Sequence, residues 1–120
     1  NSIIFGGNAE ELELGQDTTS LADYNVLLSH TLIKGKKVES ERFVDCRWAR
    51  SQNERNGIDT VFVNTSIIDI TETGYFNFHL DSLSYARNCG STNVSTLYPL
   101  DLDGKDRNSD GKPDLGAYER

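Results

Sequence analysis

Side chains that carry oxygen are concentrated in the last twenty residues of the chain. Asp106, Asn108 and Asp110 stand at alternate positions and are followed by Gly111, a spacing that matches the opening of a calcium loop. Calcium takes roughly six to eight oxygen ligands, and the glycine allows the sharp turn that such a loop makes. We therefore predict calcium as a cofactor. The predicted ligands are Asp101, Asp103, Asp106, Asn108, Asp110 and Asp114.

A second interpretation of these residues needs no ion. Aspartate and asparagine side chains accept hydrogen bonds from nearby backbone N–H groups, and such turns could build a structural cap. The position at which an EF-hand carries its bidentate glutamate is Ala117 here, so a helix–loop–helix site is excluded. A looser calcium-binding turn and a cap of hydrogen-bonded turns both remain open.

Residues suited to catalysis are sparse. The two histidines, His30 and His79, and the two cysteines, Cys46 and Cys89, are scattered without the spacing of a zinc site. No Gly-x-Ser-x-Gly motif is present. Cys46 alternates with apolar neighbours and is predicted to be a buried thiol, while a disulfide with Cys89 stays open. We predict no catalytic residue and no organic cofactor.

Two enzymatic arrangements remain as alternatives. Asp45, Asp59 and Asp69 could line one face and supply the carboxylate pair of a glycoside hydrolase. Arg47 and Arg50, which stand close to Asp45, are the only candidates for the basic residue of a polysaccharide lyase.

The net charge of −7 is unevenly distributed. Residues 34–55, the basic segment, hold seven basic and four acidic residues, whereas the rest holds five basic and fifteen acidic ones. An acidic chain disfavours nucleic acid as a partner, and no apolar run approaches the roughly 20 residues of a membrane span. The basic segment could contact an acidic glycan or could simply be a solvated strand face.

Strand-forming residues dominate the first hundred positions. Short β-branched and aromatic runs, separated by Gly, Asn and Asp, occur at 2–5, 11–14, 24–28, 31–33, 44–48, 61–63, 67–70 and 76–80. Helix is predicted only over 82–89, with Ser82 as N-cap and Gly90 as the stop.

These short runs favour an all-β fold, a right-handed parallel β-helix (solenoid) of a few rungs with an irregular C-terminal cap. Residues 1–100 would form the rungs and a closing turn, and the Asp/Gly-rich residues 101–120 would form the cap of the same domain. The predicted inward positions are Ile4, Val26, Leu28, Leu32, Val44, Cys46, Trp48, Val61, Val63, Phe76 and Phe78.

The C-terminal end carries the most specific motif. Leu100-Asp101-Leu102-Asp103-Gly104, then Arg107, then Asp114-Leu115-Gly116-Ala117-Tyr118-Glu119, resembles the terminal signature of bacterial choice-of-anchor Q-type β-helix surface proteins. Upstream pieces at 1–5, 24–28, 58–64, 76–80 and 82–90 resemble segments of that family in the same order. The chain departs from the pattern at Leu83, where the family has proline, and at Asn88-Cys89, where it has Asp-Ala.

This resemblance implies the C-terminal part of a longer, secreted or cell-surface bacterial protein, whose remaining rungs would stack at the N-terminal end. The function it favours is a non-catalytic module that contacts a polysaccharide or a cell-surface partner. The alternative is a fragment of a polysaccharide lyase or glycoside hydrolase. Fold likeness does not choose between these functions.

Overall fold

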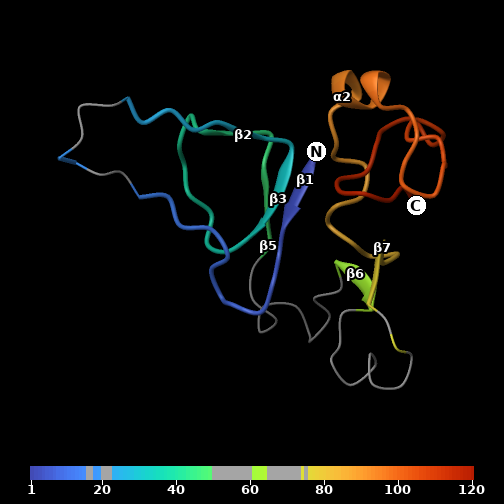
Figure 1. The fold of residues 1–120 in the computed structure, drawn as a ribbon, viewed down its shortest axis with the longest axis horizontal. Coiled ribbons are helices and arrows are strands. Elements are labelled where there is room, and N and C mark those ends of the chain that lie inside the picture. Colours follow the sequence, from blue (N-terminus) through green and yellow to red (C-terminus); the bar gives the residue numbers. More distant parts are fainter. Residues whose placement is uncertain (16–17, 20–22, 50–60, 65–73, 75) are drawn as a thin grey trace.

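A computed structural model describes residues 1–120 apart from 16–17, 20–22, 50–60, 65–73 and 75 (Figure 1). The regular elements among these residues are short. The elements are β1 (Ser2–Ile4), β2 (Leu28–Ser29), β3 (Thr31–Lys34), β4 (Phe43–Val44), β5 (Arg47–Ala49), β6 (Phe62–Asn64), β7 (Asn77–Leu80) and α2 (Thr92–Leu97).

The described strands form three small, separate sheets. The first has the order β1-β3-β5 and is parallel, the second pairs β2 with β4 in parallel, and the third pairs β6 with β7 antiparallel. The prediction of a right-handed parallel β-helix is therefore wrong: the few strands do not make a solenoid, and one sheet has the opposite pairing. β-propensity is a local property of short runs, whereas partner and direction depend on long-range packing that the runs do not encode.

Two residues with a left-handed backbone connect the first sheet to the second. The chain turns from β2 into β3 at His30, with φ of 46°, and from β4 into β5 near Asp45, with φ of 51°. His30 N donates to Val44 O at 3.0 Å, so the two corners lie one against the other. This hydrogen bond ties the corner before β3 to the corner before β5.

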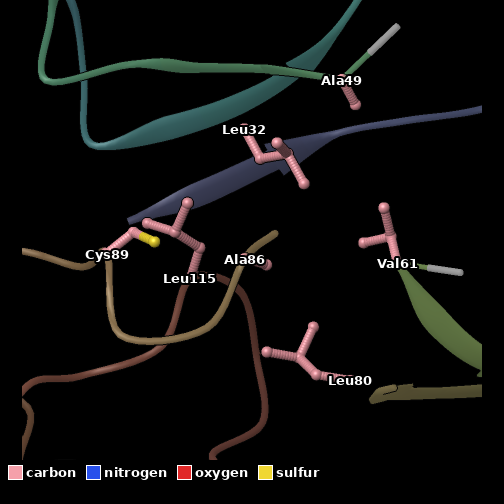
Figure 2. Close-up of a cluster of buried hydrophobic side chains, with 7 residues drawn as sticks. All are labelled: Leu32, Ala49, Val61, Leu80, Ala86, Cys89 and Leu115. Atoms are coloured by element: carbon pink, nitrogen blue, oxygen red, sulfur yellow. The ribbon is translucent and has the colours of Figure 1, made fainter. Parts of the chain in front are cut away.

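The two faces of the first sheet have different neighbours. Successive strand residues point to opposite faces, and residues in register on parallel strands point to the same one. Leu32 and Ala49 belong to the buried core cluster, which Val61, Leu80, Ala86, Cys89 and Leu115 complete (Figure 2). Ile33, fully buried, and its register partner Trp48 therefore lie on the face opposite this core. The sheet separates the core from the loops on its other side.

Only part of the predicted set of inward residues is buried. Leu32 and Val61 are, as predicted, but four of the set are exposed: Val44, Val63, Phe76 and Phe78. The core instead recruits residues from the last forty positions, such as Ala86 and Leu115, for which no strand alternation exists. A residue in an irregular segment gives no periodic signal of its burial.

The C-terminal segment, residues 101–120, packs against residues 80–91. Leu115 N donates to Ala86 O at 2.9 Å, and Gly90 N donates to Pro113 O at 2.7 Å. A Cβ on Gly90 would lie 2.8 Å from Asp114 O, so only glycine permits this approach. Helix forms at α2, not at the predicted 82–89, because residues 81–87 are taken up by turns in which Ser84 N bonds Asp81 O and Arg87 N bonds Ser84 O.

The edge of β1 is closed by this same part of the chain. Asn1 Oδ1 accepts a hydrogen bond from Ser91 N at 2.6 Å, and Asn1 Nδ2 donates to Ser91 O at 3.3 Å. The amide of Asn1 thus bonds the backbone of Ser91 as a neighbouring strand would. No helix in the described part of the chain is long and apolar enough to cross a membrane.

Candidate functional site

Asp101 is the hub of the C-terminal segment. Its Oδ1 accepts hydrogen bonds from Asp103 N at 2.9 Å and Lys105 N at 2.7 Å, and its Oδ2 accepts one from Glu119 N at 2.7 Å. Burial opposes ionisation of Asp101, but these three N–H donors, aided by the charge of Arg107, outweigh it and hold the pKa of the carboxyl below its usual value.

Asp114 plays a matching part deeper in the segment. Its side chain is fully buried, with Oδ1 accepting from Asn88 N at 2.6 Å and Oδ2 accepting from Arg120 N at 3.0 Å. Both oxygens of this predicted calcium ligand are therefore engaged by backbone donors. Asp101 and Asp114 act as side-chain caps for turns in the described arrangement.

Glu119 is a buried acid that the calcium prediction did not include. Its Oε2 accepts from Asp114 N at 3.0 Å, whereas Oε1 is buried without a partner. Burial, together with the charges of Asp114 and Asp110, raises the pKa of Glu119 to about 7 despite the opposing effect of that hydrogen bond. No spacing rule singled out Glu119; only its place in the terminal motif did.

Asp103 reaches outside the segment to β7. Its Oδ2 lies 2.6 Å from His79 Nε2, and His79 Nδ1 lies 2.6 Å from Asn77 Oδ1. The imidazole is also stacked on the ring of Tyr118, with 4.0 Å between the centroids. Both ring nitrogens of His79 therefore lie within hydrogen-bonding distance of an oxygen in this arrangement.

The three remaining predicted ligands also have partners. Asp106 Oδ1 accepts from Asn108 N at 2.9 Å, and Asn108 Oδ1 accepts from Ser95 Oγ at 2.7 Å. In the amide orientation that satisfies both groups, Asn88 Nδ2 donates to Asp110 Oδ2 at 3.1 Å. The segment is thus closed by its own hydrogen bonds, and within the described ranges no three His, Cys, Asp or Glu side chains gather as a metal-binding group. Calcium binding stays a prediction.

The residues considered for catalysis do not assemble among the described positions. Asp45 Oδ2 lies 3.7 Å from His30 Nε2, and Arg47 is exposed at the start of β5. Asp59, Asp69 and Arg50 lie outside the described residues. Both cysteines are free thiols: Cys46 is half-buried, and Cys89 is buried with Sγ 2.7 Å from Arg87 O.

A groove lies beside β5 on the described surface. Its first cavity, of about 240 Å³, is lined by Trp48 and Phe43, whose rings pack edge to face with centroids 5.1 Å apart. The other lining residues are Glu10, Leu12, Leu14, Lys36, Val38, Ser40 and Arg42. Trp48 reaches this cavity because strand alternation turns it away from the core.

A second cavity, of about 550 Å³, continues the groove past Arg42. It is lined by Tyr24, Asn25, Val26, Leu27, Ser40, Glu41 and Arg42. Ser40 and Arg42 border both cavities, and the Arg42 guanidinium lies over the Tyr24 ring at 5.1 Å from its centroid. The two cavities together, called the groove below, present aromatic rings, an amide and charged groups along an extended path.

One wall of the groove is fastened by Glu10. Its Oε2 accepts from Lys36 N at 2.9 Å, and Glu11 N donates to Lys34 O at 3.0 Å. A Cβ on Gly35 would lie 2.5 Å from Glu10 Oε2, so a larger residue there would push the carboxylate aside. These contacts tie the segment that carries Leu12 and Leu14 to the loop after β3.

Sequence reasoning missed this groove. Trp48 was predicted as a core residue, and Phe43, Tyr24 and Glu10 were not considered as site residues. The available signal was the basic segment, which was named as a possible contact for an acidic glycan. The groove forms from loops that are distant along the chain, so no linear motif marks it.

Comparison with known proteins does not assign the chain to a family. No family model matches it, and neither a curated protein nor a solved structure matches it.

Proposed function

We propose that this chain is a non-catalytic binding module of a secreted or cell-surface protein, and that it contacts glycans through the groove. The observation that carries the proposal is the aromatic wall made by Trp48 and Phe43. Aromatic rings stack on the apolar faces of sugar rings, while neighbouring polar groups bond the hydroxyls, which is the usual composition of a ligand site.

Several features support binding over catalysis. The groove holds two acids among its lining residues, Glu10 in the first cavity and Glu41 in the second, and the Glu10 carboxylate is engaged by Lys36 N. Both nitrogens of His79 are occupied, and His79 does not line the groove. A glycosidase would need two carboxyl groups across the bound sugar.

The C-terminal segment would serve this module as a structural cap. Its terminal motif places Asp114 and Glu119 in hydrogen bonds to backbone N–H groups, and Leu115 in the core. We also propose that the chain comes from a choice-of-anchor Q-type surface protein, which rests on the resemblance of that motif and of the upstream segments to the family. Calcium held by the same segment is a separate proposal, which a titration decides.

The test of glycan binding uses the single tryptophan of the chain, Trp48. Neutral and acidic oligosaccharides are titrated while the tryptophan emission is followed, and released reducing ends are assayed in parallel. Saturable changes in emission without cleavage are expected. Cleavage would show an enzyme, and absence of binding to every glycan would reject the proposal.

A further inference from the structure

The charged groups of the groove are unevenly paired. Lys36 and Arg42 line the first cavity, and among the described residues neither has a carboxylate partner. The neighbouring Lys37, in contrast, pairs with Glu39 at 2.6 Å. The one acid of the cavity, Glu10, gives its Oε2 to a backbone N–H. Among the described residues, the first cavity therefore presents two cations and one carboxylate, a net positive charge, beside an aromatic wall.

The second cavity has a different balance. It contains Glu41 and the amide of Asn25, and Arg42 stands at the border between the two cavities. Glu41 would disfavour an anionic group in this second cavity, whereas Lys36 and Arg42 both border the first cavity. Hydroxyl groups, which donate and accept, suit the Asn25 and Glu41 side.

From this arrangement we propose that the groove selects a carboxylated glycan, with a uronate unit in the Trp48 cavity and the adjoining sugar in the Tyr24 cavity. This inference rests on the proposed glycan binding and adds its ligand class. The sugar ring packs on Trp48 and Phe43, and its carboxylate takes charge-assisted hydrogen bonds from Arg42 and Lys36. The paired N–H groups of a guanidinium match a planar carboxylate. The Tyr24 ring under the Arg42 guanidinium limits that group to few orientations.

The experiment compares an oligogalacturonate with its fully methyl-esterified form, which has the same length but no charge. Tryptophan emission and calorimetry report binding to the intact chain. We expect the acidic oligomer to bind about tenfold more tightly, and the difference to shrink as salt is raised. Equal affinity for the two forms would overturn the uronate inference while leaving glycan binding in place.

Matched variants locate the charge effect. Arg42→Gln and Lys36→Gln should each weaken binding of the acidic oligomer about five- to tenfold and leave the methyl ester nearly unaffected. Arg47→Gln and Lys37→Gln remove the same charges from exposed positions outside the groove and should change little. All four positions are exposed, so folding is expected to survive, and melting curves check it.

Three outcomes count against the inference. Equal losses in the groove variants and their controls would show a general charge effect rather than a site. If a sulfated oligosaccharide bound more tightly than the uronate, the groove would select a sulfate group rather than a carboxylate. Failure of every oligosaccharide to change the tryptophan emission or to release heat would instead reject glycan binding itself, and this inference with it.

Discussion

Asp101 and Glu119 are eighteen residues apart, and the Oδ2 of Asp101 accepts a hydrogen bond from the backbone N–H of Glu119 at 2.7 Å. The same carboxylate also accepts from Asp103 N and Lys105 N. One side chain therefore holds both ends of the C-terminal segment together. Three backbone donors would lose their partner if it were removed.

Replacing Asp101 by alanine is expected to lower the free energy of unfolding by about 2–4 kcal/mol, since the buried N–H group of Glu119 and the partly buried ones of Asp103 and Lys105 would lose their partner. Urea unfolding measures the change. Asp106→Ala, at an exposed position that caps only Asn108 N, is the matched control and should cost less than about 1 kcal/mol. Similar losses in the two variants would contradict the role of Asp101 as a hub.

The pKa of Asp101 predicts the response of stability to acid. Because its folded pKa is lowered, its contribution is present above the usual carboxyl value and is lost as the pH falls through the folded value. Unfolding curves measured at decreasing pH should therefore show a loss in the wild type that is smaller in Asp101→Asn. A parallel decline of both proteins would argue against this assignment.

Glu119 predicts the opposite dependence on pH. Its folded pKa of about 7 lies above the usual value of 4.5, so its contribution is complete below 4.5 and is lost as the pH rises through 7. Glu119→Gln cannot ionise. At about pH 8 we expect this variant to be roughly 3 kcal/mol more stable than the wild type, and at about pH 4.5 to be nearly equal to it. Melting temperatures of the two proteins, measured across this pH range, show whether their stabilities diverge as the pH rises. A constant difference between them would refute the prediction.

Gly35 is predicted to control the shape of the groove. Gly35→Ala would place a methyl group against the Glu10 carboxylate and displace the wall that it fastens. We expect a loss of about 1–2 kcal/mol in stability, and weaker glycan binding. Gly7→Ala is the control, since nothing lies within 4 Å of the added atom. Unchanged binding in Gly35→Ala would show that the wall does not contact the ligand.

Calcium binding by the segment from Asp106 to Asp110 predicts a melting temperature that rises with free calcium. The gain is about 2.7 kcal/mol at a hundredfold excess over the dissociation constant. Asp110→Ala should abolish this rise and leave the core intact. Scanning calorimetry in calcium and in chelator provides the measurement. Superimposable curves would leave the segment as a cap closed by its own hydrogen bonds.

The sequence supported local features better than their assembly. Leu32 and Val61 lie in strongly apolar runs, and both are buried as predicted. Trp48 also lies in a run with strand alternation, but it faces the groove. Which face of β5 meets the core depends on how β5 pairs with its neighbouring strand. The direction of pairing also escaped prediction, as the antiparallel contact of Phe62 with Leu80 shows.

The candidate sites show the same limit. An alternation of Asp and Asn predicts oxygen-rich turns, and the turns are present. Whether a carboxylate meets an ion or a backbone N–H depends on distant donors, as with Asp114 and Asn88 N. Glu10 becomes part of the groove through a contact 26 residues away with Lys36 N.

The amide bridge between Asn1 and Ser91 has a consequence for the order of folding. β1 meets β3 through residues 29 apart, such as Ser2 and Thr31, whereas this bridge spans 90 residues. Closing the longer loop costs about 1 kcal/mol more in chain entropy. During synthesis from the N-terminal end, β1 and β3 can pair before residues 90–116 leave the ribosome. The contacts of Asn1 with those residues can form only afterwards. Until then Asn1 lacks its bonds to Ser91, so a delay in this late contact should favour pairing of the strand with another chain.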